Sequence, residues 1–92
     1  MSRIQRIRTA LEVALSPSLL EVSDDSHLHV GHAGAQDGRG HFSVLIVSAA
    51  FSGAPSLARH RAVYAALGDM MTTDIHALSI EARDPEEAHS QG

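Results

Sequence analysis

The chain contains no cysteine and no tryptophan, and aromatic residues make up only 3% of its 92 residues. Without cysteine it has no disulfide framework and no thiolate, so any metal chemistry must use histidine, carboxylates or ligands that a partner brings. A chain of this length buries only roughly 60% of its unfolded surface, and its core supplies about 3–5 kcal/mol of net stability. These limits favour a single small binding module over an enzyme.

Long hydrophobic runs and excess positive charge are also missing. No segment approaches the roughly 20 apolar residues of a membrane span, and residues 1–6 lack the apolar core of a secretory signal. We therefore expect a cytoplasmic protein that does not bind membranes. The formal net charge is −4 at pH 7, whereas autonomous DNA-binding domains usually carry a basic face. The charge argues against tight DNA binding by the domain alone.

Apolar spacing predicts a first helix that Ser2 caps and that ends before Pro17. Its core positions are Ile4, Ile7, Leu11, Ala14 and Leu15. Alternation of Leu20 and Val22 with polar residues predicts an edge strand, and the apolar run 42–48 predicts a central one. Between them, Asp24 to Gly40 is a long loop rich in glycine and histidine, which is typical of a functional or mobile segment.

The second half of the chain predicts a helical turn at 49–51, a break at 52–55, and a longer helix that carries Arg59 to Leu67. Its core stripe is expected to hold His60, Val63, Tyr64, Leu67, Met70 and Met71, with Arg59, Ala62 and Asp69 directed outward. A third strand follows, with Leu78, Ile80 and Ala82 alternating with polar residues. The polar residues 84–92 are expected to be a disordered tail after a domain that spans 1–83.

This order predicts an α+β fold with the sequence α-β-β-α-α-β. The first two strands should pair antiparallel, and the third should lie parallel to the second after a right-handed crossover through helix. The result is a mixed three-stranded sheet with helices packed on one face.

Three segments carry a resemblance to a known family. They read H-F-x-V-x-x-V-S-x-x-F-x-G from His41 to Gly53, R-H-R-x-V-Y-x-x-L from Arg59 to Leu67, and I-H-A-L from Ile75 to Leu78. Together they resemble the BolA family over about Leu20 to Arg83, which implies a type-II KH-like fold. The turn that corresponds to the G-x-x-G of RNA-binding KH domains reads Gly53-Ala54-Pro55-Ser56 here, so that mode of RNA binding is not expected.

The resemblance also implies a metal site that is completed by a partner. BolA-like proteins that pair with a monothiol glutaredoxin share a [2Fe-2S] cluster with it, in which the glutaredoxin cysteine and glutathione supply sulfur. The nitrogen ligands would be His76 of the I-H-A-L segment and His29 of the loop, with His32 and His27 as loop alternatives, and the chain alone would carry no cofactor. Imidazole in place of thiolate lowers the negative charge around such a cluster and raises its reduction potential.

Other interpretations of these histidines stay open. His76 could pack against the preceding helix through one ring nitrogen, and the loop histidines could form a solvated surface or capture zinc. A ligand role for His41 is a lesser alternative.

Two functions follow from the sequence. The first is a non-enzymatic adaptor for iron-sulfur cluster handling or iron regulation, a monomer or weak homodimer when alone, with Arg59, His60 and Arg61 as its partner surface. The second is a DNA-binding transcriptional regulator that uses a helix-turn-helix around Gly53–Leu67, because founding BolA members are described as transcription-linked morphogens. No catalytic triad is predicted, because Asp25, Ser26 and His27 are adjacent in sequence rather than held by separate elements.

Overall fold

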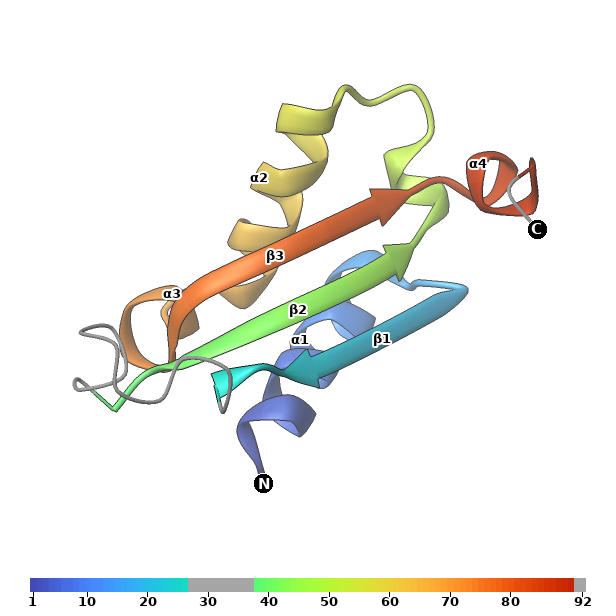
Figure 1. The fold of residues 1–92 in the computed structure, drawn as a ribbon. Coiled ribbons are helices and arrows are strands. Elements are labelled where there is room, and N and C mark those ends of the chain that lie inside the picture. The colour runs from blue at the N-terminus through green and yellow to red at the C-terminus, as the bar shows by residue number, and fades with distance from the viewer. Residues whose placement is uncertain (27–37, 91–92) are drawn as a thin grey trace.

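The computed structural model describes residues 1–26 and 38–90 (Figure 1). The predicted loop ligands His27, His29 and His32 lie outside the described residues. Within the described part of the chain, no helix has both the length and the apolar character that crossing a membrane requires.

The elements follow the predicted order, including the helical turn at 49–51, with two short helices added. They are α1 (Arg3–Leu15), β1 (Leu19–Asp24), β2 (Gly40–Val47), the 3-10 turn η3 (Ala49–Phe51), α2 (Ser56–Leu67), α3 (Met70–Thr73), β3 (Ile75–Arg83) and α4 (Pro85–Ser90).

Helix α1 begins as the sequence predicts. The Ser2 hydroxyl accepts a hydrogen bond from the Gln5 amide at 3.1 Å, and the Gln5 side chain accepts one from the Ser2 amide at 3.3 Å. This capping box satisfies two amides that the first helical turn leaves without partners. Ile7 and Leu11 are fully buried and fix the face of the helix that packs on the sheet.

The sheet has the order β1-β2-β3, with β1 antiparallel and β3 parallel to the central strand. Helices α1 and α2 lie on one face of it (Figure 1). Phe42, Val44 and Ile46 of β2 are buried on that face, while the residues between them are half-buried on the other. The predicted α+β class and the mixed three-stranded sheet are confirmed.

A one-residue irregularity interrupts the pairing of β2 with β3. Gly40 pairs with Ile75, but the next residue, His41, pairs with Ala77, so His76 is an extra residue on β3. A bulge of this kind reverses the alternation of side chains along a strand. Ile75 is consequently buried at 1% exposure, although Leu78 packs against the same core only three residues later.

Ser48 joins three elements at the other end of β2. Its hydroxyl donates to the Leu15 carbonyl of α1 at 2.6 Å and accepts from the Ala50 amide of η3 at 3.1 Å. Its amide donates to the Arg83 carbonyl of β3 at 3.0 Å. The side chain is buried, and its polar atoms are satisfied, as burial of a hydroxyl requires.

The core stripe of α2 differs from the predicted one, and Met70 and Met71 belong to the separate helix α3. Val63 and Leu67 are buried, but Tyr64 is 40% exposed, and Ala62, expected outside, packs against the core. Each residue turns an α-helix by about 100°. Tyr64 therefore lies on the flank of a helix whose contact face is centred between Val63 and Leu67.

The prediction of a disordered tail from residue 84 is wrong for residues 85–90, which form α4. The Asp84 carboxylate accepts from the Glu87 amide, and the Asp84 amide donates to the Glu87 carboxylate, both at 2.8 Å. This is a capping box with Pro85 at the first helical position, where proline is favoured. Local capping, rather than apolar periodicity, therefore defines this helix.

A buried carboxylate fixes the start of α1 to the start of β3. Asp74 accepts two parallel hydrogen bonds from Arg6, at 3.1 and 2.9 Å, one from the Arg3 Nε at 3.2 Å, and one from the Thr73 hydroxyl at 2.8 Å. The bonds from Arg6, followed by that from Thr73, hold the pKa of Asp74 below its usual range in spite of desolvation.

A depressed carboxyl pKa predicts acid-sensitive stability. The contribution of Asp74 is complete above its unfolded pKa of about 3.9, and it is lost as the pH falls through the lower folded pKa. We expect Asp74→Asn to lower the melting temperature at pH 7, and we expect this difference from the wild type to shrink below about pH 4. Thermal denaturation followed by circular dichroism, with the exposed Asp69→Asn as control, checks this. A difference that is the same at pH 7 and pH 3 would contradict it.

Candidate functional site

Two histidines meet where β2 and β3 begin. The strands are parallel, so their starts lie at the same end of the sheet, and the rings of His41 and His76 have their centroids 5.1 Å apart with the planes tilted by 46°. The bulge turns His76 away from the core and exposes it. The sequence singled out His76 and gave His41 a lesser role; the structure brings the two together.

Arg39 completes this pair, although no motif in the sequence points to it. Its Nη2 lies 3.2 Å from His76 Nδ1. A guanidinium can only donate a hydrogen bond, so Nδ1 accepts, and the neutral ring carries its proton on Nε2. A metal ion at Nδ1 would replace Arg39, and one at Nε2 would move the ring proton to Nδ1. In both cases Arg39 must leave its contact with His76.

The chain on either side of Arg39 is held in place. The Arg3 guanidinium donates to the Gly38 carbonyl at 2.6 Å, and the Gly40 amide donates to the Asp74 carbonyl at 2.9 Å. Position 40 also requires glycine, since a Cβ there would lie 2.7 Å from the Phe42 ring. The residues that surround Asp74 therefore also hold the segment that places Arg39 next to the histidine pair.

His41 is anchored through its backbone. Its amide donates to the Ser26 hydroxyl at 3.1 Å, and its carbonyl accepts from the Asp25 amide at 2.7 Å. The Asp25 carboxylate in turn accepts hydrogen bonds from the hydroxyls of Ser43 and Ser23. His41 Nε2 is buried, so a metal would approach this ring at Nδ1. Among residues 1–26 and 38–90, no three metal-binding side chains form a complete site.

Arg59, predicted to lie on a partner surface, is instead held within the fold. Its side chain is only 12% exposed and lies 2.6 Å from the Glu87 carboxylate. It also donates to the Ala54 carbonyl at 2.8 Å and to the Ala82 carbonyl at 3.1 Å. The neighbouring Arg83 carbonyl faces β2, where it accepts from Ser48. The Ala82 carbonyl therefore points to the free edge of β3, where Arg59 binds it.

The two predicted sites lie at opposite ends of β3. Arg59 binds at Ala82, six residues after His76, which corresponds to about 20 Å along a strand. His60 is half-buried on α2 and Arg61 is exposed. The structure therefore does not combine the histidine pair and the R-H-R segment into one site.

The comparisons with known proteins agree with this architecture. A family model described as BolA-like protein matches residues 11–87. The chain belongs to the BolA family. The BolA domain of SufE1 from Arabidopsis thaliana has a similar structure, with a TM-score of 0.83 and 46% identity over 95% of this chain and 96% of that one.

Curated relatives of this BolA-family chain have different names. It is 47% identical over 79 residues to BolA-like protein 1 of Homo sapiens, covering 86% of this chain and 56% of the human protein. It is 46% identical to SufE-like protein 1, chloroplastic/mitochondrial, of Arabidopsis thaliana, covering 94% of this chain but 24% of that protein. It is 40% identical to the DNA-binding transcriptional regulator BolA of Escherichia coli (strain K12), covering 83% and 70%.

The names and lengths of these relatives limit what can be said of this chain. These three relatives are named as a BolA-like protein, a SufE-like protein and a regulator, and none of the three names states an enzymatic reaction. Chloroplastic and mitochondrial forms occur among them, so the cytoplasmic location stays a prediction. The chain spans only part of the length of several relatives.

The burial of Arg59 predicts a structural role for it. We expect Arg59→Ala to lower the free energy of unfolding by about 2 kcal/mol, because it removes hydrogen bonds from a charged donor to two backbone carbonyls. Arg61→Ala, on the same helix but exposed, should change it by less than about 0.5 kcal/mol. Urea denaturation of both variants measures the difference. Equal stabilities would show that Arg59 is dispensable for the fold.

Proposed function

We propose that this chain is a non-enzymatic adaptor that pairs with a monothiol glutaredoxin and holds a [2Fe-2S] cluster with it, in iron-sulfur cluster handling or iron regulation. The observation that carries the proposal is the pair of imidazoles, His41 and His76, at one end of the sheet. The identity of the partner and of the cluster is taken from the resemblance to other BolA-like proteins.

The donor set of the chain fits such a shared cluster. Iron in these clusters accepts imidazole as well as thiolate, and the chain has histidine but no cysteine. Fewer than three metal-binding side chains gather in the described residues, so the remaining ligands must come from elsewhere. A partner that provides thiolates meets that need.

Each residue of the pair has a defined part. His76 is exposed and offers a ring nitrogen once Arg39 moves aside, while His41, held through its backbone by Ser26 and Asp25, offers Nδ1. The Arg39 guanidinium, once displaced from His76, can donate hydrogen bonds to a carboxylate of the partner or of glutathione. When bound, the cluster supplies one-electron redox chemistry and a unit of iron and sulfide for transfer.

Anaerobic reconstitution tests the proposal. Wild-type chain, monothiol glutaredoxin, glutathione, iron and sulfide should give a mixed complex with its own visible absorption and circular dichroism. We expect His76→Ala to abolish or shift that spectrum, and His41→Ala to shift it because the two rings are neighbours. The same experiment on His29→Ala, His32→Ala and His27→Ala decides whether the loop supplies a ligand instead of His41.

His89→Ala is the matched control, because His89 lies exposed on α4, away from the histidine pair. Its spectrum should equal that of the wild type. Failure of the wild type to form a mixed complex, or a spectrum that His76→Ala leaves unchanged, would overturn the proposal.

DNA binding is the second candidate, because one relative is named a DNA-binding transcriptional regulator. The charges of this chain weigh against it. All seven of its cationic side chains are arginines, and six have acceptors within the fold: Arg3, Arg6, Arg8, Arg39, Arg59 and Arg83. In the part that the structure describes, Arg61 is the one arginine without an acceptor in the fold. The element before Gly53 is a three-residue 3-10 turn rather than the first helix of a helix-turn-helix.

Because most arginines already bind acceptors of the fold, we expect weak DNA binding with little dependence on salt. Each phosphate contact contributes about −0.9 to the slope of log affinity against log salt concentration. Fluorescence anisotropy with a random duplex of about 30 base pairs should therefore give a slope near −1. A slope of about −4 or steeper that Arg61→Ala reduces would favour the regulator instead.

A further inference from the structure

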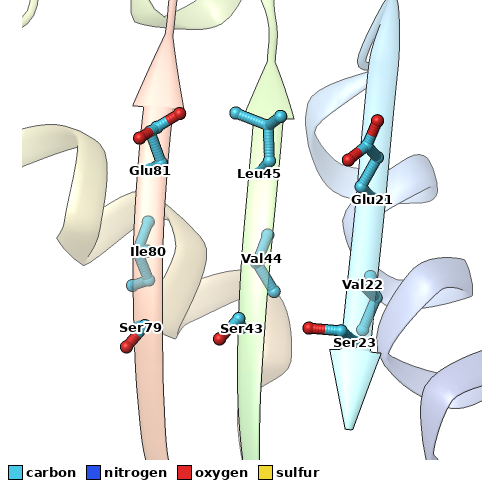
Figure 2. A pocket seen from close by; sticks show the side chains of 9 residues that line it. All are labelled: Glu21, Val22, Ser23, Ser43, Val44, Leu45, Ser79, Ile80 and Glu81. Carbon is cyan, nitrogen blue, oxygen red and sulfur yellow. The ribbon is translucent and has the colours of Figure 1, made fainter. Parts of the chain in front are cut away.

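The sheet has one face that no described helix covers. Its side chains alternate with the core residues, so that Ser43 and Leu45 of β2 point outward while Val44 points to the core (Figure 2). Ser23 and Glu21 of β1 share this outer face, and so do Ser79 and Glu81 of β3 (Figure 2).

These side chains form a hollow of about 560 Å³. Its floor is a row of three serines across the strands, with Ser23 paired to Ser43 and Ser43 paired to Ser79. The next row places Leu45 between Glu21 and Glu81. Small hydroxyl side chains keep the floor low, and no basic side chain lines the hollow.

The hollow is continuous with the histidine pair. His41 precedes Ser43 on the same face of β2, and a second, smaller depression of about 170 Å³ lies between Asp25, His41 and Ser79. From His41 to Leu45 the strand rises about 13 Å. A protein that covers about 800 Å² of surface extends further than this. One partner can therefore cover the histidines and the hollow at once.

The charges on this face favour a basic occupant. The Glu21 side chain is exposed, and its carboxylate makes no hydrogen bond or ion pair within the described residues. The Glu81 side chain is 57% exposed, and its carboxylate lies 3.0 Å from the Arg83 guanidinium. A second copy of this chain is a poor occupant, because it would bring the same glutamates and, among the described residues, a single arginine without an acceptor, Arg61.

We propose that this open face, rather than the R-H-R segment of α2, is where the partner docks, through a segment that carries arginine or lysine. The inference rests on the proposed function, because it assigns a surface to the same partner. A guanidinium or ammonium group would bind the Glu21 carboxylate and compete with Arg83 for that of Glu81, with the serine hydroxyls as further hydrogen-bonding groups and Leu45 as the apolar contact. This position brings the partner next to His41 and His76.

The proposal is tested by reversing the charge of glutamates on the open face of the sheet and, as a control, of a glutamate on helix α1 behind the sheet. We expect Glu21→Lys combined with Glu81→Lys to weaken binding of monothiol glutaredoxin at least about tenfold at 50 mM salt, because it replaces attraction with repulsion. The loss should diminish at higher salt, as exposed charges are screened. Isothermal titration calorimetry with glutathione present measures the affinity.

The control is Glu12→Lys, which makes the same change per site on α1, behind the sheet, at a residue that is also exposed and paired with an arginine. It should change affinity by less than about threefold. Ser79→Tyr fills the hollow without altering charge and suits a strand, so it should also weaken binding. Circular dichroism confirms that each variant is folded.

The outcomes separate the two proposals. If the wild type does not bind glutaredoxin, the proposed function fails and this inference fails with it. If the wild type binds, but the double glutamate variant and Ser79→Tyr bind as tightly as Glu12→Lys, the adaptor function stands and docking on the open face is overturned.

Discussion

The pairing of β2 with β3, including its single bulge, is the constraint on which the rest of the structure depends. Parallel pairing requires a crossover, so α2 and α3 must lie between the two strands in sequence and pack on one face of the sheet. The same pairing brings the starts of both strands together. The bulge then directs Ile75 into the core and His76 out of it. The histidine pair and the uncovered face are both consequences of this one arrangement.

The main elements could be predicted because their signals are local. Ser2 and Gln5 cap α1 within one turn, and strand alternation in β2 follows from residues that are adjacent in sequence. The bulge was missed because nothing local marks it. Counting in twos back from Leu78 would place His76 on the core side of β3, whereas pairing with β2 shows that it lies outside. Helix α4 was missed for a different reason, since six residues are too few to show helical periodicity.

The candidate site was predictable only in part. The family resemblance pointed to His76. Arg39 and His41 join it only because β2 pairs with β3, since Arg39 and His76 are 37 positions apart in the sequence. Arg59 was assigned to the surface because a cation on an amphipathic helix usually faces water. Its partners are Glu87, which lies 28 positions away, and two backbone carbonyls. Tertiary contacts of this kind leave no pattern in the sequence.

The fold alone does not decide the function of this chain, but the distribution of its charges restricts it. A BolA-family relative is named as a DNA-binding regulator, and a fold is compatible with many functions. In this chain, arginines stabilise the fold. Arg3 and Arg6 bind Asp74, and Arg59 binds a backbone carbonyl at the edge of β3. The carboxylates of Glu21 and Glu81 stay on an uncovered face that leads to the histidine pair. That face would repel a polyanion, and the helices offer a polyanion few arginines that lack an acceptor in the fold. A basic protein that carries thiolate ligands would find complementary charge and the imidazoles side by side, so electrostatics and metal chemistry select the same kind of partner.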